Sequence, residues 1–260
     1  MSVDTQAITK LRELTGAGIG DCKATLEEAG GDINKAVELL RKKGAIKAAK
    51  KSDRATNEGV IALVKSDGKV CLVGLACETD FVSRNQDFID TVNNLAAKLM
   101  ELGVAEFTTW VQDKIKNELS VKIGENMKIS AADIVEGKII GTYLHSNKKV
   151  AAVVVLAKGS QELANDIAMQ VVAMSPKYLK PEDIAKAELD KEKEIYREQL
   201  RAEGKNEAMW DKIIEGKLQK YYSDVCLVKQ PFIKDDKISI EKLLQQNDAG
   251  EIISFQRYQI

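Results

Sequence analysis

The stretch CLVGLACETDFVSRNQDF, residues 71–88, joins the pattern of a buried strand to the start of an amphipathic helix. Its first seven residues are apolar or glycine, as in a strand that is covered on both faces. The letters ETDF then place two acids, a hydroxyl and an aromatic ring at the end of that strand. Such a junction can have a catalytic, a folding or a binding role, and the rest of the sequence is needed to discriminate among these three interpretations.

Local pattern alone favours a folding role for this junction. Thr79 is suited to cap the following helix, Asp80 to oppose the helix dipole in its first turn, and Phe81 to pack as a hydrophobic staple. The alternative is an exposed Phe81 beside an acid on a rigid corner, which would be a probe directed at another protein.

Hairpin signals surround the junction and then recur. VIALVK, the turn SDG and KVCLVGLAC predict a β-hairpin, and a long helix follows with apolar residues at Phe88, Val92, Leu95 and Leu99. EGKIIGTYLHSNKKVAAVVVLAKG, residues 136–159, predicts a second hairpin, again followed by an apolar-striped helix that ends near Met174. The repeat predicts an α+β protein with two similar β-hairpin–helix core subdomains, related by a pseudo-twofold axis.

The remaining segments are mostly helical. Residues 1–55 predict three short helices, the third capped by Asp32, and then a Lys-rich linker that begins after Gly44. Residues 106–128 also read as mostly helical. The thin apolar stripe of residues 181–225 predicts an antiparallel helical hairpin, or coiled coil, that protrudes from the body. The tail predicts a short helix and a last strand that return to the second subdomain.

We therefore expect four parts in the chain. They are residues 1–55 (three helices and linker), 56–135 (N-terminal core subdomain), 136–180 with 226–260 (C-terminal core subdomain), and 181–225 (helical hairpin).

Charge and cysteine content narrow the class of protein. Lys and Arg total 39 against 40 Asp and Glu, a net charge of −1, which argues against a general electrostatic grip on nucleic acid or on an acidic membrane. The basic run at 41–54 lacks interleaved aromatics, so helix-end cations and a solvated linker are favoured over RNA contact. The longest apolar run, AAVVVLA, is too short to span a bilayer as a helix. Four cysteines without a CxxC pair and an N-terminus without an apolar run predict reduced thiols in the cytoplasm.

The inventory of catalytic groups is thin. His145 is the only histidine, at the tip of the second hairpin, where a surface polar role is favoured over general-base catalysis. H-E-x-x-H and G-x-S-x-G are absent from the sequence. GAGIG at 16–20 fails as a nucleotide loop, because Asp21 stands where glycine is needed and a helix rather than a strand precedes it. The sequence predicts no covalent catalysis and no cofactor or metal.

At this point the chain resembles the bacterial elongation factor Ts family, the guanine-nucleotide exchange factors of elongation factor Tu. The matching pieces span nearly the whole chain: KLRELTGAGIGDCKATLEEAGGDINKAVELLRKKGAIKAAKK, TDFVSRNQDF, KIGEN, IAMQVVAMSPKYLKPEDI and QPF. The resemblance implies an N-terminal domain similar to ubiquitin-associated (UBA) modules, two α+β core subdomains and a protruding helical hairpin.

The resemblance also implies a site. In relatives, the Phe of TDFV, here Thr79, Asp80, Phe81 and Val82, wedges between helices of the partner's GTP-binding domain, and the neighbouring acid helps to disturb its Mg²⁺ and phosphate site. The resemblance implies further partner contacts at Arg12, Ile19, Ile123, Gly124 and His145. The implied partner is elongation factor Tu, GDP-bound or nucleotide-free, with 1:1 and 2:2 complexes and a homodimer all left open.

Three departures from the family pattern stand out. Ile19-Gly20 replaces the two Met that often follow the TGAG turn, Glu78 stands where many relatives carry Gln, and the chain lacks the C-terminal helix of longer members. Two other hypotheses are an enzyme of unknown class and an adaptor that uses residues 1–55 to bind a ubiquitin-like protein or RNA. Deletion of residues 1–55 discriminates, because an adaptor would lose all partner binding.

Overall fold

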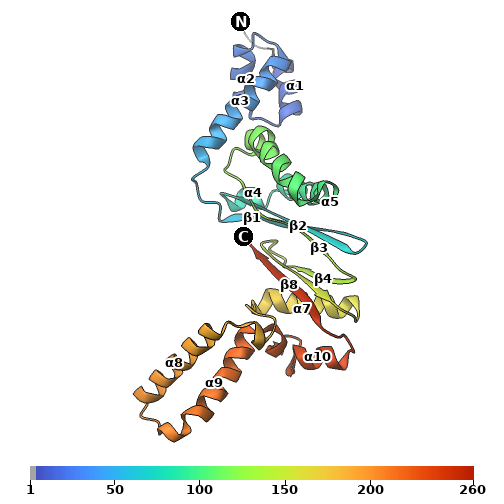
Figure 1. Ribbon diagram of the computed structural model, residues 1–260. Coiled ribbons are helices and arrows are strands. Elements are labelled where there is room, and N and C mark those ends of the chain that lie inside the picture. The colour runs from blue at the N-terminus through green and yellow to red at the C-terminus, as the bar shows by residue number, and fades with distance from the viewer. Residues whose placement is uncertain (1–3) are drawn as a thin grey trace. The chain divides into compact units, whose positions relative to one another are not determined.

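The computed structural model describes residues 4–260, which divide into two compact units. The first contains the chain up to residue 135 together with 147–149 and 260, and the second contains 136–146 and 150–259. Each unit is described by itself (Figure 1). Within residues 4–260, no helix combines the length and the apolar character needed to cross a membrane.

The first unit begins with three packed helices: α1 (Thr5–Thr15), α2 (Ile19–Glu28) and α3 (Ile33–Lys51). They enclose a small apolar cluster that includes Leu11, Leu26 and Leu40. Asp32 caps α3, as predicted, by accepting hydrogen bonds from the Asn34 and Lys35 amides at 2.9 and 3.1 Å. A UBA-like arrangement of these helices stays a prediction.

The predicted linker after Gly44 is wrong in its first part, because α3 continues to Lys51. The run AIKAAKK contains good helix formers and no proline, so the helix does not stop at Gly44. The glycine has a packing role instead: a Cβ added at Gly44 would lie 2.2 Å from Cγ2 of Val121. It allows α3 to approach the segment that carries Val121.

A three-stranded sheet in the order β1–β2–β3 forms the body of the first unit. Its strands are β1 (Glu58–Ser66), β2 (Lys69–Cys77) and β3 (Lys128–Glu136). β1 and β2 form the predicted antiparallel hairpin, with Glu58 opposite Cys77 and Ser66 opposite Lys69. The long helix α5 (Gln86–Lys114) packs on this sheet, and a core around Leu75, Phe88 and Leu99 fills the space between them.

Residues 106–128 are mostly helical, as predicted, but the sequence prediction did not include strand β3, which begins at Lys128. The helical segment kinks at Gly103, passes through a π-helical turn η1 (Ile115–Leu119) and ends with α6 (Ser120–Ile123). KISAADIVE then forms an edge strand with only Val135 buried. Two alanines and an aspartate are poor strand formers, so this strand depends on pairing with β2 rather than on its own propensity.

The second unit repeats the order of hairpin and helix, as predicted. β4 (Ile139–Leu144) and β5 (Val150–Leu156) pair antiparallel, and α7 (Gln161–Met174) packs against them. The last strand, β8 (Ile252–Gln259), pairs antiparallel with β5, so the tail does return to this sheet. A pseudo-twofold relation between the units stays a prediction.

The predicted helical hairpin is formed by α8 (Lys186–Ala202) and α9 (Trp210–Val225), which lie side by side (Figure 1). It has its own small cluster, with Leu200, Ile214 and Leu218 buried, distinct from the core under the sheet. The turn of the hairpin contains η3 (Glu207–Met209). The short elements outside the hairpin are η2 (Pro181–Asp183) before it, and η4 (Leu227–Lys229), β6 (Pro231–Phe232), β7 (Asp235–Ser239) and α10 (Ile240–Gln246) after it.

Candidate functional site

The junction between β2 and α5 carries a four-residue helix, α4 (Asp80–Ser83). Thr79 is its N-cap: the side-chain oxygen accepts from the Val82 amide at 3.4 Å, and the backbone carbonyl accepts from the Ser83 amide at 3.2 Å. Asp80 lies in the first turn of α4, as predicted. The capping part of the folding hypothesis is therefore confirmed.

The staple part of that hypothesis is wrong, because Phe81 is 84% exposed. Its neighbours point the other way: Val82 is half-buried against the core of the first unit and Ser83 is buried. A turn of helix that anchors Val82 and Ser83 leaves the Phe81 ring on the outside. An apolar ring so exposed on a well-anchored corner is the feature expected of a binding surface.

Asp80 already has a cationic neighbour. Its carboxylate lies 3.1 Å from the guanidinium of Arg84, one turn further on; the Arg84 side chain is largely exposed and that of Asp80 is partly exposed. An exposed pair of this kind is weak and exchanges readily for other partners. The corner thus presents a weakly paired carboxylate beside an exposed aromatic ring.

Two carboxylates hold the base of this corner in a reciprocal arrangement. Glu125 accepts from the Glu78 amide at 2.9 Å, the Thr79 amide at 3.1 Å and the Thr79 hydroxyl at 2.5 Å. In return, the Glu78 carboxylate accepts from the Asn126 amide at 2.7 Å. We call Glu78, Thr79, Glu125 and Asn126 the tip clasp.

The clasp is tied to the segment that follows α3. The Asn126 side chain donates to the backbone carbonyls of Ser52 and Arg54 at 3.2 and 2.8 Å, and the Arg54 guanidinium lies 3.2 Å from the Glu78 carboxylate. The hydrogen bond from the Asn126 amide, helped by Arg54, lowers the pKa of Glu78. Glu78 is therefore ionised at neutral pH and fixed in the clasp.

Part of the basic run at 41–54 is used inside the molecule. Lys43 pairs with Glu28, Lys51 donates to the Gly124 carbonyl, and Arg54 pairs with Glu78. Lys50 and Lys51, which were predicted to lie in the linker, instead lie in the last turn of α3, where cations oppose the helix dipole. These contacts give the run a structural role.

The other predicted contact residues lie in three places. Ile123 is half-buried against the core, and Gly124 is exposed with a φ of 79°, a left-handed conformation that ends α6 and turns the chain so that Glu125 reaches the junction. Arg12 and Ile19 are exposed on α1 and α2, and Ile19 is 58% exposed. His145 is exposed after β4, in the second unit. The structure thus links Ile123 and Gly124 to the TDFV corner through Glu125.

Thiol chemistry at the corner is disfavoured. The Cys77 thiol lies below the tip and donates to the Thr79 carbonyl at 3.4 Å. Burial, with help from the nearby Glu125 and Glu58 carboxylates, raises its pKa to about 12, so the thiol is protonated at neutral pH. The other three cysteines are also free and buried.

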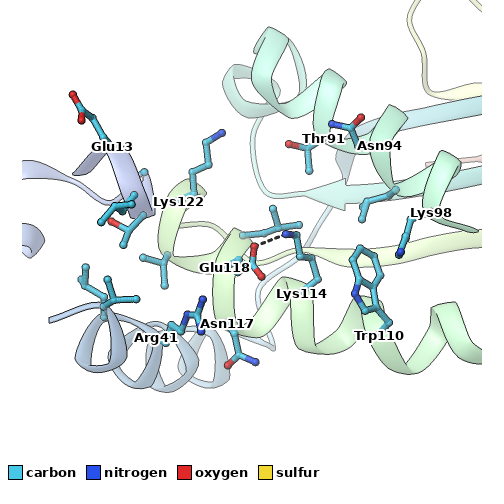
Figure 2. Close-up of a pocket in the computed structure, with 18 residues that line it drawn as sticks. Glu13, Arg41, Thr91, Asn94, Lys98, Trp110, Lys114, Asn117, Glu118 and Lys122 are labelled. Atoms are coloured by element: carbon cyan, nitrogen blue, oxygen red, sulfur yellow. Dashed lines mark hydrogen bonds and ion pairs between the residues drawn. The ribbon is translucent and has the colours of Figure 1, made fainter. Parts of the chain in front are cut away.

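A cavity of about 580 Å³ lies elsewhere in the first unit (Figure 2). It is bordered by α1, α3 and the α5–α6 segment, and its lining contains no cysteine, histidine or serine. Figure 2 shows the ion pair between Lys114 and Glu118, and the Lys98 side chain beside Trp110. The Lys98 ammonium nitrogen lies 5.9 Å from the centroid of the Trp110 ring. None of the predicted site residues lines this cavity. Among residues 4–260, no group of three or more His, Cys, Asp or Glu could hold a metal.

Sequence reasoning missed Glu125 and Asn126. The KIGEN segment drew attention only to Ile123 and Gly124, because nothing local indicates that the following carboxylate caps amides 46 and 47 residues away. The only available signal was a glycine that ends a helix immediately before an acid.

Comparison with known proteins gives one consistent result. The family model described as "Elongation factor TS" matches residues 78–260. A protein named "Elongation factor Ts" from Lawsonia intracellularis is 40% identical over 295 residues, covering 100% of this chain and 99% of the relative. Relatives of the same name from Hydrogenobaculum sp. and Christiangramia forsetii are 39% and 41% identical; the alignments cover 100% and 96% of this chain and 99% and 96% of the relatives.

Proposed function

The chain belongs to the elongation factor Ts family, and from this premise we propose that it promotes release of GDP from elongation factor Tu by presenting Phe81 to that partner. It acts as a translation elongation factor in the cytoplasm, binds the GDP-bound and nucleotide-free partner, and performs no covalent chemistry itself. The observation that carries the proposal is the 84% exposure of Phe81 on an otherwise anchored corner.

The four residues of the tip have separate tasks. Phe81 inserts between helices of the partner's GTP-binding domain, and Asp80 brings negative charge toward the Mg²⁺ and phosphate region. Thr79 and Val82 hold the short helix, through its cap and its core contact. Arg12, Ile19, Ile123, Gly124 and His145 extend the contact surface.

Magnitudes show that the ring cannot act alone. Burial of a Phe surface of about 150–250 Å² at about 25 cal/mol/Å² contributes about 4–6 kcal/mol at most. GDP held at nanomolar strength corresponds to about 12 kcal/mol. Phe81 therefore biases the partner toward an open state, and the wider interface and the weakened Mg²⁺ and phosphate contacts supply the remainder.

Release of a fluorescent GDP analogue from elongation factor Tu tests the proposal. The wild-type chain at micromolar concentration should accelerate release, and Phe81→Ala should retain much of the binding while losing most of the acceleration. Val104→Ala, which trims an exposed apolar side chain on α5 of the same unit, serves as the matched control and should behave as wild type. No acceleration by the wild-type chain would reject the function, and full activity of Phe81→Ala would reject the role of the ring.

A further inference from the structure

We propose that Glu125 is a positioning residue for Phe81: its carboxylate closes the tip clasp and so fixes the direction in which the ring is presented. This inference rests on the proposed function and adds to it a residue outside the TDFV segment. Glu125 does not need to touch the partner, because it acts through the backbone on which α4 begins.

The contacts of Glu125 converge on the two residues that start α4. One carboxylate oxygen accepts from the amides of Glu78 and Thr79, at 2.9 and 3.1 Å, and the other accepts from the Thr79 hydroxyl at 2.5 Å. The Thr79 hydroxyl also accepts from the Val82 amide, at 3.4 Å. One acidic side chain is thereby connected to both ends of the turn that carries Phe81.

The loop that carries Glu125 is itself held on two sides. The Asn126 amide donates to the Glu78 carboxylate at 2.7 Å, and the Asn126 side chain donates to the carbonyls of Ser52 and Arg54. Lys51 donates to the Gly124 carbonyl. A carboxylate on a fixed loop restrains its target far better than one on a mobile loop, because the loop has little freedom left to lose.

The short helix needs such restraint. α4 has four residues, too few for a helix to be stable by itself, and Phe81 gains no packing inside its own chain. Without the clasp the corner would sample many directions, and the partner would have to order it on binding. Loss of the clasp should therefore lower the maximal rate of exchange more than it weakens the encounter.

Hydrogen exchange on the free protein tests the restraint without any partner. In Glu125→Ala, the amides of Glu78 and Thr79 lose their acceptor and should exchange about tenfold faster or more. Glu106→Ala, which removes an exposed glutamate from α5, is the matched control and should leave these amides unchanged. Unchanged exchange at these two amides in Glu125→Ala would overturn the clasp.

Exchange kinetics test the link to Phe81. The rate of GDP release is measured against factor concentration, which separates the maximal rate from the half-saturating concentration. Glu125→Ala should lower the maximal rate about tenfold, with a change of less than about threefold in the half-saturating concentration. Glu125→Gln keeps an acceptor oxygen for the two amides and an NH₂ group that can donate to Thr79, so it should recover most of the rate.

A double-mutant cycle separates positioning from a general structural defect. If Glu125 acts through the ring, Phe81→Ala/Glu125→Ala should be no slower than Phe81→Ala alone, within about twofold. A full additional tenfold loss in the double variant would overturn the positioning role. Thr79→Ser and the isosteric Thr79→Val give a second pair, because only serine keeps both the cap and the bond to Glu125.

The two levels of the proposal fail in different ways. A wild-type chain that does not accelerate GDP release overturns the proposed function, while faster exchange of the two amides in Glu125→Ala would still support Glu125 as the residue that holds the corner. A wild-type chain that accelerates release while Glu125→Ala is equally fast overturns the positioning role and leaves the function in place.

Discussion

Glu78 makes the corner sensitive to acid, whereas a glutamine at this position would not. Hydrogen bonding from the Asn126 amide, helped by Arg54, lowers the pKa of Glu78 in the folded chain. Because the pKa is lowered, ionised Glu78 stabilises the folded chain fully above the unfolded pKa of about 4.3. This stabilisation is lost as the pH falls through the pKa of Glu78 in the folded chain. The ionised form is the one that the clasp binds.

We therefore expect Glu78→Gln to be less stable than wild type at pH 7 and to approach wild type as the pH falls below 4. The measurement is local opening of residues 76–84 by hydrogen exchange at several pH values, corrected for intrinsic exchange. Glu106→Gln is the control and should show no such convergence. A difference between Glu78→Gln and wild type that stays constant from pH 7 to pH 3 would contradict the role of this carboxylate.

Local pattern predicted the polar half of the corner correctly, but it favoured a packed Phe81 ring, which the structure exposes. Thr79 and Asp80 are local features of a helix start, and local pattern is sufficient to predict them. Exposure of Phe81 depends on which neighbour takes the inward place, and Val82 takes it. The role of Glu125 could not be predicted from local sequence, because residue 125 lies beside the end of β2 only when β3 has joined the sheet.

At the scale of elements, the clearest differences from prediction are α3 and β3. Helix α3 was expected to end at Gly44, yet that glycine is where α3 packs closely against Val121. The sequence shows a helix breaker, and only the tertiary contact shows why it is tolerated there. The hairpins of both units followed from continuous apolar runs separated by clear turn signals, so they were predictable.

Because of this packing, the effect of a Gly44 substitution on stability should change sign with the residue at position 121. Gly44→Ala gains about 1 kcal/mol of helix propensity but places a methyl group 2.2 Å from the Val121 side chain, a clash that costs about 1–3 kcal/mol. The single variant should therefore weaken the three-helix part, whereas in a Val121→Ala background the same change should stabilise it. Hydrogen exchange of the α3 amides in the four proteins measures both effects. Equal effects of Gly44→Ala in the two backgrounds would exclude the proposed contact.

The base of the helical hairpin is joined by a second shared carboxylate. Glu188 on α8 accepts from the Tyr178 hydroxyl at 2.5 Å and from the Tyr221 hydroxyl of α9 at 2.7 Å. The bond to Glu188 raises the pKa of Tyr178; burial first, and then Glu188, raise that of Tyr221. Raised tyrosine pKa values mean that these bonds stabilise the fold fully below about pH 10 and are lost as the pH rises through the folded values.

Glu188→Gln should let Tyr178 ionise at lower pH than it does in the wild-type chain, because the charge that opposes tyrosinate is removed. Carbon-13 NMR of ring-labelled tyrosine follows each ionisation separately. Glu194→Gln, on the exposed side of α8, is the control, since Glu194 pairs with Arg197 instead. An unchanged Tyr178 titration in Glu188→Gln would show that the bond does not persist in solution.

At the scale of the whole molecule, exchange is a coupling between two ligands of one partner. If this chain weakens the binding of GDP to elongation factor Tu by some factor, GDP must weaken the binding of this chain by the same factor. High affinity for the nucleotide-free partner and low affinity for the GDP-bound partner are therefore two expressions of one coupling free energy. Under the proposed function, Phe81 contributes to this coupling only through contacts that differ between the two states of the partner.

Both sides of this cycle can be measured. We expect Phe81→Ala to reduce the coupling factor about tenfold or more, equivalent to about 1.4 kcal/mol or more, because the ring is buried only when the partner's helices have separated. The loss should appear as weaker binding to the nucleotide-free partner, with affinity for the GDP-bound partner within about threefold of wild type. Titration calorimetry with each form gives one ratio, and GDP affinity with and without the chain gives the other. Coupling that stays at the wild-type value in Phe81→Ala would place the nucleotide-sensitive contacts elsewhere on the interface.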